Sequence, residues 1–255
     1  MKYTEQPWVV LFGGAGREEI IKLMLCEGIH ISIVLAPKNQ SKKLEGSIAA
    51  IRNLGVTLKT VGKNELLQAL SKYQKGNMLS VGYPYIIPKS IYAQYRVALN
   101  VHPTLLPKYR GPTTGAYILI NNETESGSTV HFLSEEADKG DIVLQSYVPL
   151  TPFDTLRSLQ RKVYGKEPAL VVKAMRSLDD GIIPTHQNEA LATSYPKVRK
   201  PEDSEINPNK SLLELFNEIR ATDPKEFPAF FYYHGAKVNV KFWRDSKLAD
   251  SEGEL

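Results

Sequence analysis

The sequence predicts an α/β fold with a doubly wound, mostly parallel sheet. Short runs of apolar residues alternate along the chain with segments whose apolar residues recur at helical spacing. The first run covers residues 8–12, and a glycine-rich turn at 13–16 links it to the first helical pattern. A continuous apolar run is typical of a strand buried on both faces, and strand–helix–strand order gives parallel strands joined by right-handed crossovers. These patterns indicate a Rossmann-like sheet.

The other elements follow from the same patterns. Further strands are expected at 31–36, 56–61, 78–81, 97–102, 126–132 and 141–150, and helices at 17–27, 43–54, 65–73, 89–95, 111–121 and 156–178. The composition shifts from Leu191, and beyond it we expect an amphipathic helix at 211–220, a hairpin that turns at His234–Gly235, and a frayed tail at 246–255. We therefore predict a main domain at 1–187 and a small α+β annex at 188–255.

Composition limits the class of protein. With 255 residues, 42% of them hydrophobic and 24% charged, the chain resembles an ordinary soluble globular protein. The net charge of +4 is too small to argue for a nucleic-acid partner. The single cysteine, Cys26, excludes a disulfide framework and thiolate metal clusters. The start of the chain has no apolar run of the signal-peptide type, so we expect a cytoplasmic protein without a membrane partner.

The glycine-rich turn was compared with the dinucleotide-binding fingerprint. After Gly14-x-Gly16 the pattern requires Gly or Ala where this chain has Glu19, and no acidic residue ends the second strand. Both departures argue against a dehydrogenase. Two interpretations stay open: a tight turn, or a substrate-anion site in which Gly14 and Arg17 face the anion at a helix N-terminus.

Polar residues at the end of the 97–102 strand are the candidates for chemistry. Asn100 and His102 are two residues apart and so point to the same side of a strand. Pro103 and Pro107 keep the following loop irregular, and Asp138 lies in a later loop. The carboxyl ends of strands are where open α/β sheets bind ligands. Asn100 could donate hydrogen bonds there, and His102 could carry a proton.

Several motifs appear together in a recognisable order. Asn100-x-His102 precedes Pro-Thr-Leu-Leu-Pro, the stretch Gly-Ser-Thr-Val-His-Phe covers 127–132, and Asp138-x-Gly140-Asp-Ile follows. This set resembles the 10-formyltetrahydrofolate-dependent formyltransferases over roughly residues 8–178. The resemblance implies an enzyme with 10-formyltetrahydrofolate as co-substrate and Asn100, His102 and Asp138 as catalytic residues. In such a reaction Asn100 would stabilise an oxyanion, His102 would donate to it or accept a proton, and Asp138 would orient His102.

The apolar loop at 82–88 fits this resemblance, because in the family the matching loop surrounds the pterin ring of the folate. As structure alone, the loop could instead pack under the next helix. The residues expected to bind the folate are Tyr83, Pro84, Tyr85, Ile86, Ile87, Ser134 and Ala137.

The tail resembles the start of the C-terminal region in formyltransferases that act on methionyl-tRNA or on nucleotide-linked amino sugars. Because the sequence ends soon afterwards, our leading hypothesis is a homodimeric N-formyltransferase for a nucleotide-linked amino sugar, acting in the synthesis of a surface polysaccharide. The expected substrate-binding residues are Gly14, Arg17, Arg110, Gly111 and Tyr232. The aromatic residues at 230–233 could equally form a hairpin core.

Other functions remain open at this point. They are a methionyl-tRNA formyltransferase, a glycinamide ribonucleotide formyltransferase, and a folate- or nucleotide-binding module without catalysis. His131 alternates within an expected strand and is interpreted as structural, while His30, His186 and His234 are left unassigned. No His, Asp or Glu set has metal-ligand spacing, so we predict no catalytic metal.

Overall fold

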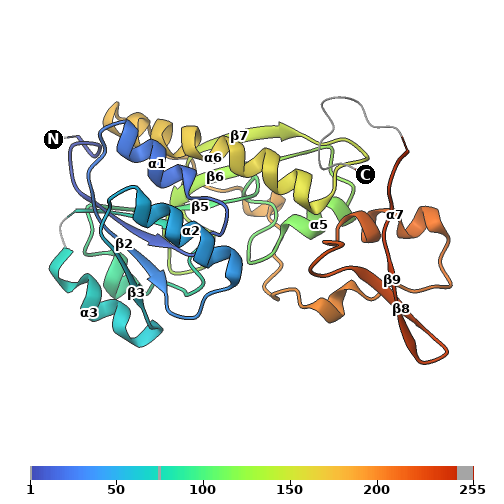
Figure 1. Cartoon of the computed structure of the whole chain (residues 1–255). Helices are drawn as coiled ribbons and strands as arrows, with labels where there is room; N and C mark the ends of the chain where they lie inside the picture. The colour runs from blue at the N-terminus through green and yellow to red at the C-terminus, as the bar shows by residue number, and fades with distance from the viewer. Residues whose placement is uncertain (1, 74–75, 246–254) are drawn as a thin grey trace.

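A seven-stranded sheet forms the centre of the protein (Figure 1). The computed structural model describes residues 2–73, 76–245 and 255. The strand order is β3-β2-β1-β4-β5-β6-β7. The strands are β1 (Trp8–Phe12), β2 (Ile31–Pro37), β3 (Leu58–Val61), β4 (Asn77–Val81), β5 (Val97–His102), β6 (Glu125–Phe132) and β7 (Ile142–Pro149). The first five strands along the chain are parallel, whereas β6 and β7 are antiparallel. The expected Rossmann-like, mostly parallel sheet is confirmed.

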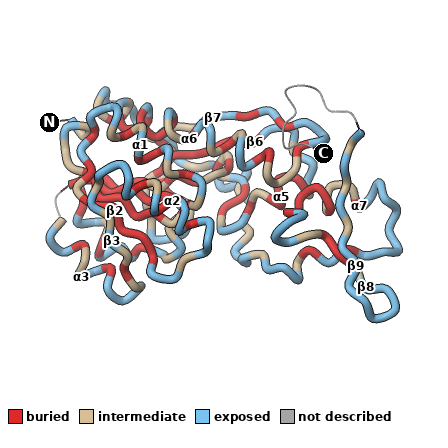
Figure 2. The backbone as a smooth tube through the Cα atoms, viewed as in Figure 1, coloured by how far each residue is buried: buried red, intermediate tan, exposed pale blue. Residues whose placement is uncertain are grey.

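Helices cover both faces of the sheet. They are α1 (Glu19–Cys26), α2 (Lys42–Asn53), α3 (Leu66–Leu70), α4 (Lys89–Tyr92), α5 (Gly115–Ile120) and α6 (Leu156–Asp179). Alternate residues of β1 face opposite sides: Val10 packs in a cluster with α1, α2 and α6, whereas Val9 packs in a cluster with α3 and α4. Every residue of β1 is therefore buried, which explains its unbroken apolar sequence. The neighbouring β2 is almost entirely buried as well (Figure 2).

Several expected helices are shorter in the structure. The helix expected at 65–73 is divided into a 3₁₀ turn at Lys63–Glu65, α3, and a second 3₁₀ turn at Ser71–Tyr73. The helix expected at 111–121 begins only at Gly115, because Gly111 and Thr113 have φ values of 107° and 53°. Positive φ is incompatible with a right-handed helix, so these residues form part of the loop instead.

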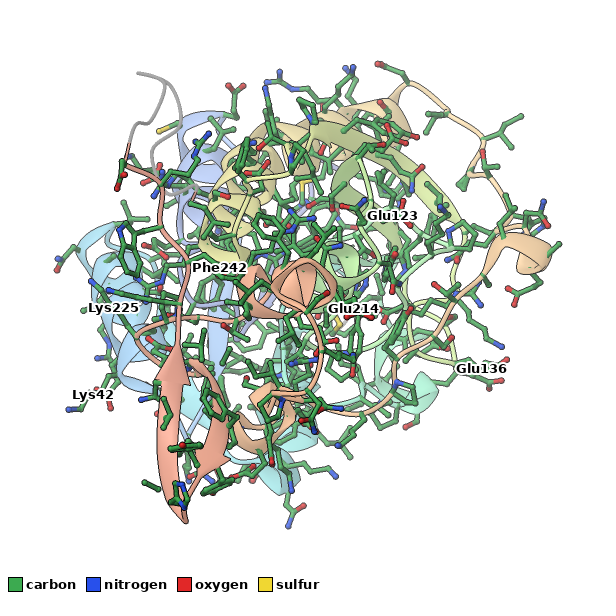
Figure 3. All side chains as sticks on the ribbon, turned by 90° about the vertical axis from the view of Figure 1, so that its right-hand side faces the viewer. Lys42, Glu123, Glu136, Glu214, Lys225 and Phe242 are labelled. Carbon is green, nitrogen blue, oxygen red and sulfur yellow. The ribbon has the colours of Figure 1, made fainter. Side chains whose placement is uncertain are left out.

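The annex consists of α7 (Leu212–Arg220) and a two-stranded hairpin, β8 (Ala229–Tyr233) and β9 (Ala236–Val240). His234 and Gly235 both have positive φ, which matches the hairpin turn expected there. Phe242 follows the hairpin and stacks on Phe216 of α7 at 5.4 Å (Figure 3). The buried Arg220 joins the annex to the main domain, since its guanidinium donates to the carbonyls of Asp154 (3.0 Å) and Leu119 (3.3 Å).

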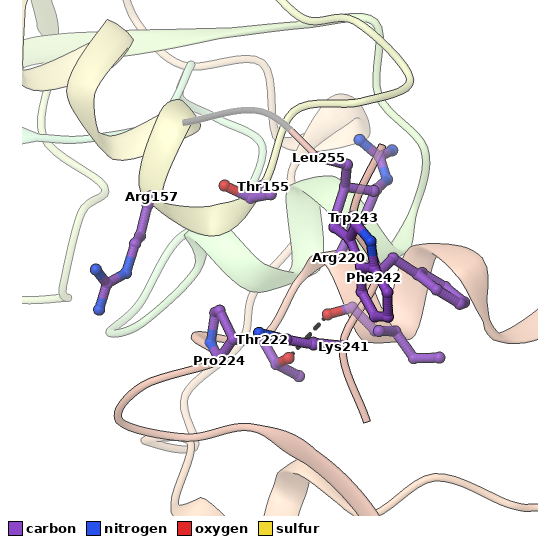
Figure 4. Close-up of a pocket in the computed structure, with 10 residues that line it drawn as sticks. Thr155, Arg157, Arg220, Thr222, Pro224, Lys241, Phe242, Trp243 and Leu255 are labelled. Atoms are coloured by element: carbon purple, nitrogen blue, oxygen red, sulfur yellow. Dashed lines mark hydrogen bonds between the residues drawn. The ribbon is translucent and has the colours of Figure 1, made fainter. Parts of the chain in front are cut away.

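Between the annex and α6 lies a small cavity of about 150 Å³ (Figure 4). Its lining includes Thr155 at the start of α6, Thr222 after α7, and the terminal Leu255. The domain boundary at 187/188 stays a prediction. Most of the tail that was expected to fray, residues 246–254, lies outside the described residues. Within the described ranges, no helix combines the length and the apolar character needed to cross a membrane.

Candidate active site

Asn100 and His102 lie at the carboxyl end of β5, between β4 and β6. Asn100 pairs across the sheet with His131, and His102 pairs with Thr129. His102 is buried, with 6% of its surface exposed, and Asn100 is half-buried. The end of this strand therefore presents an amide and an imidazole to the same side, as the spacing predicts.

The hydrogen bond of His102 fixes the tautomer of its neutral ring. Nε2 lies 2.9 Å from the carbonyl oxygen of Tyr109. Since a carbonyl can only accept, Nε2 carries the hydrogen. Nδ1 faces Asp138, with 3.6 Å between Nδ1 and Oδ1. Proton gain and loss by His102 therefore take place at Nδ1, on the side of the carboxylate.

Asp138 is held by its own backbone conformation and by a neighbouring loop. Its φ is 59°, a left-handed conformation that aspartate adopts more readily than most residues. Oδ2 accepts a hydrogen bond from the amide of Gly111 at 2.9 Å. Burial acts to raise the pKa of Asp138, but His102, His131, the Gly111 amide and Arg110 together outweigh it, so the pKa lies below its usual value. The side chain is a carboxylate at neutral pH.

His131 belongs to the same cluster, although the sequence suggested only a structural role. Its Nδ1 donates to the carbonyl of Phe132 at 2.8 Å, so Nε2 is left to accept from Nδ2 of Asn100 at 3.0 Å. Nε2 also lies 3.7 Å from Oδ1 of Asp138. Burial, more than any other cause, lowers the pKa of His131 to about 4, although Asp138 opposes this. The neutral ring thus orients the Asn100 amide. The cross-strand register of β5 and β6 would have revealed this contact, but the sequence does not give it.

Gly14 and Arg17 do not suit the anion site that was one interpretation of the glycine-rich turn. Arg17 is 4% exposed, and its guanidinium forms an ion pair with Glu167 of α6, with 2.5 Å between Nε and Oε2. The same guanidinium donates to the carbonyl of Val101 at 3.0 Å. A Cβ at Gly14 would lie 2.8 Å from Cδ of Arg17, so the glycine leaves room for that side chain. The structure supports the tight-turn interpretation.

Arg110 is also bonded within the protein. The residue is 3% exposed, and its guanidinium donates to Oε1 of Gln187 (2.7 Å) and to both carboxylate oxygens of Glu189 (2.6 and 2.9 Å). The expected contact with a substrate is therefore wrong for this guanidinium in the described conformation. The backbone amide of Gly111 donates a hydrogen bond to Asp138, and this contact places Gly111 at the candidate site.

The 82–88 loop is partly packed into the core and partly exposed. Ile87 is buried in the core cluster beneath α4, as the structural interpretation requires, whereas Ile86 is 76% exposed. The rings of Tyr83 and Tyr85 meet edge to face at 5.6 Å. Burial raises the pKa of Tyr83 to about 12. Only part of the 82–88 loop therefore exposes apolar surface beside the end of β5.

The remaining expected folate-binding residues lie in the loops that follow β4 and β6. Pro84 is exposed in the 82–88 loop, and Ala137 is exposed next to Asp138. Ser134 begins the same loop as Asp138 and donates to the carbonyl of Glu136 at 2.7 Å. The 82–88 loop follows β4, and the loop that holds Asp138 follows β6. Both strands are neighbours of β5 in the sheet.

Tyr232 lies on the hairpin, which projects away from the sheet (Figure 1). Its ring meets Phe230 edge to face at 5.8 Å, and 57% of the residue is exposed. Phe230 is buried and takes the core role that alternation along the strand allows. The structure does not bring Tyr232 to the catalytic cluster.

Metal ligands and enclosed cavities were examined separately. In the described part of the chain, no three His, Cys, Asp or Glu side chains are grouped to hold a metal ion. The cavity in Figure 4 is formed by the annex and α6, and a second, of about 360 Å³, lies between β3 and α3. Neither cavity includes Asn100 or His102.

The structure is an α/β fold that brings an amide, an imidazole and a carboxylate together beside the end of one strand. A model of the formyl transferase family matches residues 28–175. The chain belongs to the formyl transferase family. This confirms the expected resemblance to 10-formyltetrahydrofolate-dependent formyltransferases, the class of enzyme and the formyl donor.

Curated relatives are similar over part of their length. A methionyl-tRNA formyltransferase of Lactococcus lactis is 27% identical over 92% of this chain and 67% of its own length. Another, of Fusobacterium nucleatum, is 29% identical over 63% of this chain and 52% of its own. The chain thus spans between half and two thirds of these relatives.

Two solved structures are similar over more of their length. An N-formyltransferase of Helicobacter canadensis, in complex with folinic acid and dTDP-3-aminofucose, has a TM-score of 0.71 at 21% identity, over 91% of this chain and 86% of its own. A 4-N formyltransferase of Francisella tularensis has a TM-score of 0.78 at 21% identity, over 96% of this chain and 100% of its own. These likenesses establish the fold.

Proposed function

We propose that this protein transfers a formyl group from 10-formyltetrahydrofolate to the amino group of a nucleotide-linked amino sugar. The observation that carries the chemistry is a cluster in which the carboxylate of Asp138 faces both His102 and His131, and His131 contacts the amide of Asn100. An amide that cannot titrate lies beside an imidazole that can, which is the pair of groups that formyl transfer requires.

The reaction needs a proton acceptor and an oxyanion donor. As the acceptor amine attacks the formyl carbon, a new carbon–nitrogen bond forms and the carbonyl oxygen becomes negative. Nδ2 of Asn100 has two hydrogens, and His131 accepts only one of them. The second is available to the oxyanion. Nδ1 of His102 accepts the proton that the attacking nitrogen loses and then donates it to the folate nitrogen, whose bond to carbon breaks as the tetrahedral intermediate collapses.

Asp138 stabilises the charged form of His102. Its Oδ1 faces Nδ1, the atom that gains the proton, at 3.6 Å. This distance exceeds that of a good hydrogen bond, so the interaction in the free protein is electrostatic. Catalytic hydrogen bonds commonly shorten once substrate is bound. Asp138 therefore favours proton transfer to His102 without bonding to the substrate itself.

The choice of acceptor has separate support. The two similar N-formyltransferase structures, one of them in complex with dTDP-3-aminofucose, are matched over 86% and 100% of their length, compared with 67% and 52% for the two methionyl-tRNA formyltransferases. The annex at 188–255 contains ten basic and twelve acidic residues, so it has no excess of positive charge for a phosphate backbone. Both observations favour a small acceptor.

A methionyl-tRNA acceptor remains the second candidate, because the curated relatives in sequence carry that name. A panel assay separates the two. The enzyme and 10-formyltetrahydrofolate are incubated with nucleotide-linked amino sugars that differ in base and amine position, and separately with methionyl-tRNA and glycinamide ribonucleotide. Mass spectrometry should find one sugar nucleotide heavier by one formyl group. If only methionyl-tRNA is formylated, the sugar proposal is wrong.

A further inference from the structure

A segment between α6 and α7 lies against both loops of the candidate active site. We call residues 187–195 the linker segment. It starts a few residues after Thr185, which pairs with Ile142 at the start of β7. From there it makes contacts with the loop after β5 and with the loop that holds Asp138. In the sequence, a change in composition is the only feature that marks this segment.

One end of the linker segment holds the loop after β5. Thr193 accepts a hydrogen bond from the amide of Tyr109 through Oγ1 (2.8 Å) and one from the amide of Arg110 through its carbonyl (2.9 Å). The Tyr195 amide donates to the Arg110 carbonyl at 2.8 Å, and the Tyr195 ring stacks on Tyr109 at 5.5 Å. Tyr109 has φ 60°, an unfavourable conformation that these contacts hold. Its carbonyl is the partner of His102.

The other end of the linker segment holds the Asp138 loop through one side chain. Nε2 of Gln187 donates to the carbonyls of Asp138 and Gly140, both at 2.8 Å. Oε1 accepts from the Arg110 guanidinium at 2.7 and 3.1 Å. The amide orientation follows from chemistry, because a carbonyl only accepts and a guanidinium only donates. Gln187 therefore joins the two loops that flank His102, and all four of its hydrogen-bonding positions are used.

We propose that Gln187 is a positioning residue for formyl transfer, acting through Asp138. Its two N–H groups hold the Asp138 backbone in its left-handed conformation, and this places the carboxylate opposite Nδ1 of His102. Gln187 donates to the backbone of Asp138 and so acts on the carboxylate without touching it. The proposal rests on the catalytic roles given above to His102 and Asp138, but it does not depend on which amine is the acceptor.

The test uses a substitution that separates the two halves of the amide. Gln187→Glu keeps an acceptor for Arg110 but removes both donors to the Asp138 loop. We expect kcat to fall by about 10- to 100-fold, the usual effect of removing an outer contact that orients a reacting group, with KM for the acceptor changed less than about twofold. The control is Gln94→Glu, an exposed amide that donates to Ser90 within the α4 region. It should leave kcat unchanged.

A double-mutant cycle shows whether the effect passes through Asp138. In the Asp138→Asn background, Gln187→Glu should reduce kcat far less than in the wild type, because the carboxylate that Gln187 positions is already gone. An equal loss in both backgrounds would overturn the proposal. The acceptor is whichever amine the wild type formylates, so a failed sugar assignment does not affect this result.

A measurement without turnover completes the test. The Asp138 carboxylate can be titrated by carbon NMR in the wild type and in Gln187→Glu. His102, His131 and Arg110 lower the pKa of Asp138 in the folded protein against the effect of burial. If Gln187 holds the carboxylate among them, the pKa should rise toward its usual value in the variant. An unchanged titration curve would contradict the proposal even if activity were lost.

Discussion

Asp138 and His102 face each other across 3.6 Å, with Oδ1 of the carboxylate opposite Nδ1 of the imidazole. The other carboxylate oxygen is bound to the Gly111 amide, and the other ring nitrogen is bound to the Tyr109 carbonyl. The loop after β5 thus holds each residue by a hydrogen bond to the atom that faces away from the other residue. Nδ1 of His102 is left to gain or lose a proton, and Oδ1 of Asp138 faces it. The proton-transfer step of the proposed mechanism therefore takes place at Nδ1.

The first prediction concerns His102. In His102→Asn the side chain stays polar but can no longer accept a proton, so kcat should fall by about two to four orders of magnitude. Circular dichroism and tetrahydrofolate binding should stay as in the wild type. A variant at His186, whose side chain is 91% exposed and lies outside the cluster, is the matched control. Near-normal turnover by His102→Asn would remove His102 from the mechanism.

The second prediction concerns the pH dependence of stability. The folded-state pKa of His131 is about 4, against 6.5 for an unperturbed histidine. Between these values the unfolded chain binds more protons than the folded protein. The contribution of His131 is therefore fully present above pH 6.5 and decreases as the pH falls toward 4, by up to about 1.4 kcal/mol for each pH unit.

Urea unfolding of the wild type and of His131→Asn between pH 4 and 8 measures this effect. The difference in unfolding free energy between the two proteins should be constant above about pH 7 and change steadily below it. Titrating groups that do not interact with His131 cancel in the difference. A difference that does not vary with pH would show that His131 is not held neutral in the folded protein.

The third prediction concerns the buried ion pair of Arg17 and Glu167. Glu167 also accepts from Ser128 at 2.7 Å, and the pair links α6 to the turn after β1. Glu167→Gln leaves the Arg17 guanidinium buried without a charge partner, which should lower the unfolding free energy by about 3–5 kcal/mol.

The matched control is Arg176→Gln, which breaks the surface pair with Glu27. Because this pair is largely exposed, its loss should change the unfolding free energy by less than about 1 kcal/mol. Similar effects of both substitutions in urea titrations would show that the Arg17 pair is not a buried one.

The fourth prediction tests the apolar loop after β4. Ile86→Asp places a charge on a side chain that is 76% exposed, so the fold should keep its stability while tetrahydrofolate binding weakens. Ile87 is unsuitable for this purpose because it is buried in the core. Ile183→Asp, at a residue that is 86% exposed, is the control. Calorimetry that finds equal affinity in wild type and Ile86→Asp would place the folate elsewhere.

The sequence by itself determined the sheet, most of its strands and the hairpin turn. These features depend on local patterns: continuous apolar runs such as β1, helical spacing such as that of α6, and the His234–Gly235 pair. It also identified Asn100 and His102 as neighbours on one side of a strand, because side-chain direction along a strand follows from spacing alone.

Only the tertiary structure decided which residues, distant in the sequence, contact Asn100, Arg17 and the loops around His102. His131 reaches Asn100 through the register of β5 and β6, Arg17 finds Glu167 on α6, and Gln187 folds back between two loops. Each contact depends on how separate elements pack, and no local periodicity encodes that packing. For this reason the sequence could not choose between the two interpretations of Arg17 or show the contact of His131 with Asn100, since both depend on partners far away along the chain.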